Sequence, residues 1–217
     1  MSKPLPLMII LLIYGSNLSP LIALLIAIKS YIKGKRLDRI SISVLALVTI
    51  SFTADLSSYF FALVFGSNYW IINCYFILEI ALTGFLFGFI LNHKIIITLY
   101  ILISLGFATL NTVVGFHYYH GEFLAISGLL SIIMCCLSLN SLYQNESNLY
   151  IENVPTFWYV VGLLTYFSGA LFSFILSSDI LKQQHLHFEY SWAFHNIANI
   201  LKNLLFAIGL WKVRAAV

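Results

Sequence analysis

Three charged side chains in apolar surroundings are the best candidates for chemistry in this sequence. Lys202 lies in the middle of the last apolar segment, and only two acids, Asp55 and Glu79, occupy comparable positions in other segments. A charged side chain at the centre of a bilayer costs about 2.5–3.5 kcal/mol on insertion scales. Such residues face other helices and usually bind an ion, a proton or a ligand. They name neither a reaction nor a ligand here.

Lys202 belongs to a polar stripe. Its members recur at spacings of three and four residues, so a helix would place them on one face. They are Trp192, His195, Asn196, Asn199, Lys202, Asn203 and Phe206. A face this polar must contact other helices rather than lipid. We therefore predict a cluster between the second, third and seventh segments that binds a small ligand or a proton. Its expected members are Asp55, Glu79, His195, Asn196, Asn199 and Lys202.

The charges of this cluster do not balance. Counted from the segment ends at about 1.5 Å per residue, Glu79 and Lys202 lie at about the same depth, which predicts an ion pair. Two acids and one lysine leave one negative charge, so one acid keeps its proton or His195 carries one. A proton, a cation or a cationic ligand could bind at such a site. The alternative is a purely structural cluster that holds three helices together.

The composition indicates a membrane protein. Only 9% of the 217 residues are charged and 61% are hydrophobic, whereas a soluble domain carries about 25% charged residues. Because the bilayer core offers no water, each spanning segment must pair its own backbone groups, which favours helices. The three cysteines lie inside apolar segments and indicate buried side chains rather than a disulfide framework or a zinc site.

Seven segments are long enough to cross a bilayer, which takes about 20 helical residues. They are 5–29, 40–66, 68–91, 94–116, 121–143, 154–177 and 188–211. Short connections between them predict antiparallel neighbours in one bundle. We therefore predict an all-α, polytopic membrane protein with a single domain over residues 1–217, without a cleavable signal peptide. Pro20 predicts a kink in the first helix, and Thr83, Gly84 and Gly88 predict close packing inside the bundle.

The basic residues predict the orientation. Eight of them fall on one side of the seven segments, and only Lys3 and Lys182 fall on the other. The eight are Lys29, Lys33, Lys35, Arg36, Arg39, Lys94, Lys212 and Arg214. The positive-inside rule then places the N-terminus outside and the C-terminus in the cytoplasm. The basic first connection could also hold anionic lipid headgroups.

The histidines offer a weaker site. His117 and His120 form one pair and His185 and His187 another, all on the predicted outer side. A metal site needs three or four ligands in a fixed geometry, whereas both pairs are expected in loops. We therefore predict no metal and no other cofactor, with zinc at these histidines as the alternative.

Four segments of the sequence resemble a family of small uncharacterised bacterial seven-helix inner-membrane proteins. They are 153–158 (Asn-Val-Pro-Thr-Phe-Trp), 166–169 (Tyr-Phe-Ser-Gly), 195–203 (His-Asn-Ile-Ala-Asn-Ile-Leu-Lys-Asn) and 209–212 (Gly-Leu-Trp-Lys). The resemblance implies a multi-pass protein of the bacterial inner membrane, and it implies no activity.

We predict a sensor or receptor-like protein that is not an enzyme. The cluster would bind a small ligand or a proton and change the helix packing on the cytoplasmic side. The expected partners are membrane lipids and a separate signalling protein in the cytoplasm or the membrane. No nucleic-acid partner is expected, and the sequence does not indicate an oligomeric state.

Two other functions compete with this prediction. Alkaline-ceramidase-like hydrolases are seven-helix proteins with a serine, an aspartate and three zinc-binding histidines, for which Asp55, Ser51 or Ser58 and the outer histidines are available. Their helical motif is not found here. A lysine in helix seven and an acid in helix three are similar to the retinal site of microbial rhodopsins, but Ala198 stands where those proteins usually carry an acid. A secondary carrier is disfavoured because the sequence has no inverted repeat.

Overall fold

The fold is a bundle of α-helices. The computed structural model describes residues 7–116, 120–145, 150–180 and 185–213, with the backbone alone for residues 145, 176–180 and 185–191. The helices in these residues are α1 (Leu7–Ile32), α2 (Arg39–Phe65), α3 (Tyr69–Ile90), α4 (Lys94–Val114), α5 (Gly121–Asn145), the 3₁₀ helix η1 (Ile151–Asn153), α6 (Pro155–Ile180) and α7 (His185–Lys212). In this part of the chain, seven helices are long and apolar enough to cross a membrane, which confirms the predicted all-α class.

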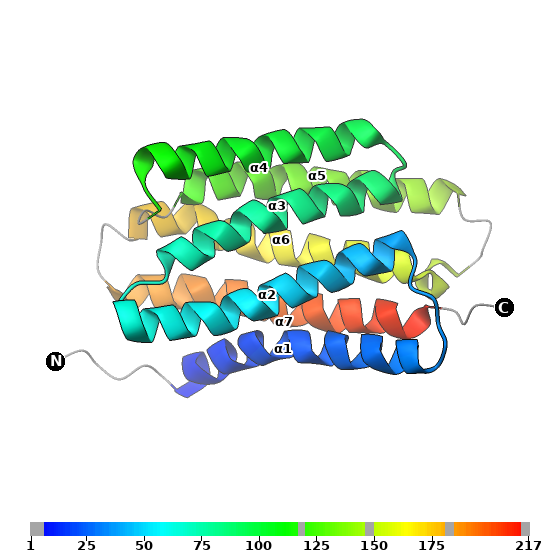
Figure 1. Ribbon diagram of the computed structural model, residues 1–217, viewed down its shortest axis with the longest axis horizontal. Coiled ribbons are helices and arrows are strands. Elements are labelled where there is room, and N and C mark those ends of the chain that lie inside the picture. The colour runs from blue at the N-terminus through cyan, green and yellow to red at the C-terminus, as the bar shows by residue number, and fades with distance from the viewer. Residues whose placement is uncertain (1–6, 117–119, 146–149, 181–184, 214–217) are drawn as a thin grey trace.

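The seven long helices lie side by side with alternating direction (Figure 1). α7 packs mainly against α6 and α1, α3 lies between α2 and α4, and α5 packs against α6. We call the end with the starts of α1, α3, α5 and α7 the N-terminal end, and the opposite end the C-terminal end. The predicted adjacency of successive helices is confirmed for most pairs, while α4 and α5 meet through long side chains such as the stacked Phe107 and Phe123.

Helix ends follow local chemistry. α2 begins after Asp38, whose carboxylate accepts a hydrogen bond from the backbone N–H of Ser41 at 2.9 Å, as an N-cap does. It ends at Gly66, whose positive φ of 70° suits a residue without a Cβ. The predicted helix ends agree with the structure to within three residues.

α1 continues through Pro20, which has no N–H to donate to the Ser16 carbonyl one turn earlier. The hydroxyl of Ser19 donates to that carbonyl at 2.8 Å instead. The helix therefore keeps this carbonyl satisfied where its own ladder is broken. The kink predicted from Pro20 stays a prediction.

The bundle is apolar outside and partly polar inside. Large apolar side chains such as Leu25, Leu63 and Ile95 are exposed, whereas Glu79, Asn199 and Lys202 are buried. A soluble protein seldom exposes so many large apolar side chains while it buries charged ones. It fits a protein whose outer surface contacts lipid and whose polar groups must find partners among the helices.

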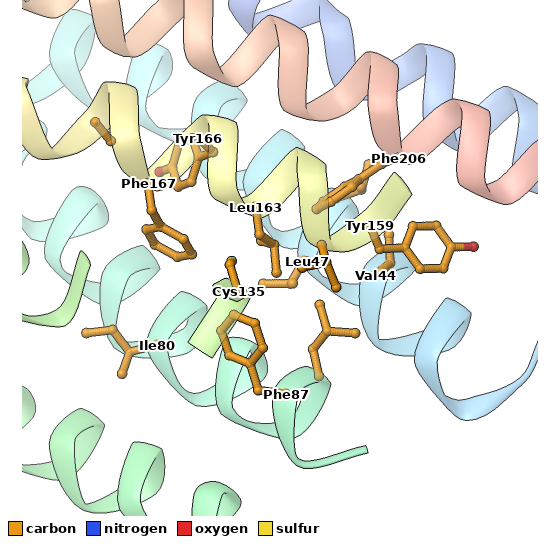
Figure 2. Close-up of a cluster of buried hydrophobic side chains, with 14 of the residues drawn as sticks. Val44, Leu47, Ile80, Phe87, Cys135, Tyr159, Leu163, Tyr166, Phe167 and Phe206 are labelled. Carbon is orange, nitrogen blue, oxygen red and sulfur yellow. The ribbon is translucent and has the colours of Figure 1, made fainter. Parts of the chain in front are cut away.

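The apolar core has members on all seven long helices, and Figure 2 shows the part of it between α2, α3, α5, α6 and α7. The buried side chains labelled there are Val44, Leu47, Ile80, Phe87, Cys135, Tyr159, Leu163, Tyr166, Phe167 and Phe206. Cys135 packs among them as a small apolar side chain, as predicted, whereas Cys74 is half-buried and Cys136 is exposed, so the prediction of a buried side chain is wrong for Cys136. The core therefore fixes α6 and α7 against the rest of the bundle.

Two glycines on α3 let α4 approach closely. A Cβ at Gly84 would overlap Cβ of Tyr100, and one at Gly88 would overlap the side chain of Ile97. The small residues thus pack inside the bundle, which confirms the predicted internal role. Tyr100 is buried in this contact, and its hydroxyl lies 3.2 Å from Ser131 Oγ on α5.

Gly84→Ala is expected to destabilise the protein by about 1–3 kcal/mol, because the added methyl group meets the Cβ of Tyr100, which cannot rotate away. Gly106→Ala is the matched control, since nothing lies within 4 Å of a Cβ at this exposed position of α4. Thermal unfolding of both variants in detergent measures the difference. Equal melting temperatures for the two variants would contradict the close α3–α4 contact.

Candidate functional site

The polar face of α7 is turned into the bundle. Asn196, Asn199, Lys202 and Asn203 are all buried, and Lys202 is only 4% exposed. The prediction that this face packs against other helices is confirmed. Because α7 lies between α6 and α1, partners for these side chains come first from those two helices.

Two asparagines of α7 bind α1. Asn199 donates to the Ser16 hydroxyl at 2.9 Å, and Asn203 donates to the Ser19 hydroxyl at 2.8 Å. The sequence analysis placed the cluster between the second, third and seventh helices and did not include α1. The run of small polar residues before Pro20 could have indicated α1 as a partner, because it provides hydroxyl groups where the helix lacks a backbone hydrogen bond.

Glu79 is held by two tyrosines. The hydroxyl of Tyr75, one turn earlier on α3, donates to Oε1 at 2.6 Å, and the hydroxyl of Tyr166 on α6 donates to Oε2 at 3.5 Å. The carboxylate is 6% exposed. Both of its oxygens therefore accept hydrogen bonds from groups that carry no charge.

Lys202 contacts a ring. Its Nζ lies 3.9 Å from the centroid of the Tyr166 ring, a cation–π contact worth about 2 kcal/mol when it is desolvated. Among the residues that the structure describes, Lys202 and Glu79 form no ion pair, so the predicted direct pair is wrong. Tyr166 separates the two charges and contacts both of them.

Tyr166 is the site residue that the sequence analysis missed. A tyrosine inside an apolar helix has the same pattern as a core residue, so nothing in its spacing marked it. α6 approaches α7 closely at Gly169, where a Cβ would lie 2.6 Å from Cβ of Ala198. This approach brings Tyr166 within reach of Lys202, one helical turn further along α7.

Asp55 lies apart from this trio. It is half-buried on α2 and lines a cavity of about 290 Å³ between α1, α2, α3 and α7. Its Oδ2 is buried and has no hydrogen-bond partner within the described part of the chain. Lys202 is close enough for its charge to act on Asp55 and on Glu79, but it does not line this cavity.

His195 reaches the same cavity from α7. Its ring stacks on Trp192 at 4.7 Å between centroids and meets Tyr166 edge-on at 5.4 Å. Its Nδ1 is buried without a partner among the described residues. Asn196 and Asn199 also line the cavity. Four of the six predicted cluster residues therefore line the same cavity, whereas Glu79 and Lys202 do not.

The cavity lies in the half of the bundle nearer the N-terminal end. Its lining includes Asn68, which precedes α3, and Tyr59, which is 58% exposed and so brings the cavity to the surface. Tyr75 lines the cavity and also donates to Glu79.

Glu79 itself lines a second space of about 10 Å³, enough for about one water molecule. It borders Thr83, Ser127 and Ser131.

The metal candidates are only partly described. His117 and the side chains of His185 and His187 lie outside the described residues. The backbone places His185 and His187 in the first turn of α7, so their predicted position in a loop is wrong. A helix can begin with polar residues at its solvated end, and a helix boundary predicted from apolar residues alone leaves them out. His120 packs edge-on against Phe107, and burial lowers its pKa. No group of three possible metal ligands occurs among the described side chains, and the metal prediction stays a prediction.

Tyr166→Leu is expected to destabilise the protein more than Tyr166→Phe, by about 2 kcal/mol, because leucine removes the ring from Lys202 while phenylalanine removes only the hydroxyl. In a Lys202→Met background, the difference in destabilisation between Tyr166→Leu and Tyr166→Phe should be smaller by about 1–2 kcal/mol. Unfolding of the four variants in detergent gives this double-mutant cycle, which cancels the packing loss common to both backgrounds. Strictly additive losses would exclude the cation–π contact.

The chain was also compared with known proteins. No family model, no curated protein and no solved structure matches it. The resemblance to small bacterial seven-helix proteins therefore stays a prediction.

Proposed function

We propose that this chain is a receptor-like membrane protein whose cavity between α1, α2, α3 and α7 binds a small organic cation. One observation carries the proposal. Asp55 and His195 each bring to this cavity a buried polar atom that has no partner in the described residues. A buried polar group without a hydrogen bond costs about 1–3 kcal/mol, and a ligand with a donor group would recover that energy.

Charge selects the sign of the ligand. Glu79 already accepts two tyrosine hydroxyls, and Lys202 already contacts Tyr166. Asp55 is the remaining acid of the cluster, and the one that lines the cavity. Two acids against one lysine leave one negative charge, which a proton neutralises when the cavity is empty and a cation when it is filled.

The walls suit an ammonium group. Tyr59, Tyr75, Phe76 and Trp192 place aromatic rings around the cavity, and such rings attract organic cations. Asn196 and Asn199 add amide groups for a hydroxyl or carbonyl of the ligand. A volume of about 290 Å³ lies at the small end of ligand sites. The ligand class is therefore a small alkylammonium ion with one further polar group.

Signalling would pass through α7. A cation in the cavity contacts α7 at His195 and Asn199, and Asn199 also binds Ser16 of α1. A change in this contact alters how α7 packs on α1 and α6 as far as the C-terminal end. By the positive-inside rule that end is cytoplasmic and the cavity opens outside, in a bacterial inner membrane. A separate signalling protein would read the change there.

A zinc hydrolase is the second candidate, because Asp55, Ser58 and His195 line one cavity. Zinc content and lipid hydrolysis by the purified protein test it. A retinal protein is less well supported, because Lys202 does not line the larger cavity. In addition, Ala198 occupies the position where rhodopsins usually carry an acid, and it packs closely against Gly169.

Choline is expected to raise the melting temperature of the purified protein, whereas its neutral isostere 3,3-dimethyl-1-butanol is not, because only the cation compensates Asp55. Asp55→Asn should weaken choline binding by at least about 30-fold, the equivalent of about 2 kcal/mol for a buried charge pair that loses one partner. Calorimetric titration in detergent measures this affinity.

Glu122→Gln is the matched control, since Glu122 is an exposed acid at the same end of the bundle and does not line the cavity. It should bind choline as the unmodified protein does. Equal stabilisation by choline and by the neutral isostere, or unchanged binding by Asp55→Asn, would contradict a cation site at Asp55.

A further inference from the structure

A second cavity lies at the C-terminal end of the bundle, away from the Asp55 site. It has a volume of about 160 Å³ and is formed by the last turns of α1, the residues that follow α1, and the end of α7. Its lining residues are Ile26, Lys29, Ser30, Lys33, Lys35 and Trp211. The function proposed above makes no use of this cavity.

The cavity is held in shape by contacts between α1 and α7. Lys35 Nζ donates to the backbone carbonyl of Trp211 at 2.8 Å, and the Ser30 hydroxyl donates to the carbonyl of Leu210 at 3.3 Å. Lys29 Nζ lies 5.1 Å from the centroid of the Trp211 ring. These bonds satisfy carbonyls in the last turn of α7, where a helix carries negative partial charge. Lys35 is thus a fixed part of the cavity.

The lining is strongly basic. Three lysines border this space, and no acidic residue is among the described side chains that line it. Lys33 directly follows α1, and its backbone N–H donates to the carbonyl of Lys29 at 3.2 Å, so the two lysines are one helical turn apart. At this spacing like charges repel. Both side chains are exposed, so each ammonium group can be reached by a common ligand. An anion between them would remove the repulsion, and a phosphate group provides several acceptors for ammonium donors.

The position of the cavity identifies the source of the anion. α1 and α7 are both long and apolar enough to span a membrane, and the cavity lies where both end. Trp211 is 57% exposed there, and tryptophan favours the headgroup level of a bilayer. Leu25 and Ile28 of α1 are exposed just before the lysines, so they offer an apolar path for an acyl chain.

We propose that this cavity binds the phosphate of an anionic phospholipid headgroup, with Lys29 and Lys33 as the residues that contact the phosphate and with Lys35, Ser30 and Trp211 as the wall. Basic pockets between transmembrane helices recognise lipid headgroups in this way. The bundle would therefore carry a bound lipid at the end of the α1–α7 pair, at a site that does not need the ligand proposed near Asp55.

Native mass spectrometry of the full chain with phosphatidylglycerol tests the proposal. The protein should retain phosphatidylglycerol in preference to phosphatidylcholine of the same acyl chains. Lys33→Gln should weaken retention about fivefold, and Lys29→Gln combined with Lys33→Gln about 30-fold. Lys94→Gln is the matched control, because Lys94 is an exposed lysine that starts α4 at the same end of the bundle and lies outside the cavity.

Each alternative has its own outcome. A loss for Lys94→Gln as large as that for Lys33→Gln would mean diffuse attraction by the basic end and would overturn the site. Binding of glycerol 3-phosphate as tight as that of the lipid would mean a free phosphate site instead. Equal retention of the two lipids would exclude a headgroup site altogether. Melting curves of Lys33→Gln without added lipid show whether a loss comes from unfolding, and unchanged curves with reduced retention support the site.

Discussion

The structure depends on satisfying the polar face of α7 without water. Asn196, Asn199, Lys202 and Asn203 cannot face lipid, and a buried polar group without a partner is costly. α7 must therefore lie where other helices carry hydrogen-bonding groups. α1 supplies Ser16 and Ser19, the second of which also replaces the backbone donor that Pro20 lacks. One short run of α1 thus serves its own backbone and the packing of α7.

The charge of Lys202 imposes a second condition on α6. Because the small side chains of Gly169 and Ala198 let α6 and α7 come close, the Tyr166 ring lies against the ammonium group while its hydroxyl donates to Glu79. A single aromatic side chain therefore contacts both a buried cation and a buried acid. With those two charges engaged, Asp55 is left at the cavity wall with a buried oxygen that has no partner among the described residues. Under the proposed function, a cation in the cavity would compensate its charge.

The sequence was sufficient for the parts of this arrangement that follow from one helix at a time. Length and apolarity predict seven helices, and the spacing in α7 predicts its buried face, since helical period is a local property. Depth along the bundle, however, gives only the height of Glu79 and Lys202, and not the direction in which each side chain points. The direct ion pair was therefore wrong. No site role was predicted for Tyr166 or Ser16, because tyrosine and serine are ordinary residues in apolar helices. Only the packing of α6 and α1 on α7 gives them a role.

The two cavities share one structural element, although they lie toward opposite ends. The α1–α7 pair forms part of the wall near Asp55 through Ser16 and Asn199, and it forms the basic cavity through Ser30 and Trp211. Both helices are continuous between these points, so a shift of one helix against the other changes both walls. If the ligands proposed for the two cavities both favour one α1–α7 packing, each would change the affinity of the other by the same factor, because such coupling is reciprocal. A lipid bound at the C-terminal end would in this way alter the packing of α1 on α7, and with it the affinity of the cavity near Asp55 for its ligand.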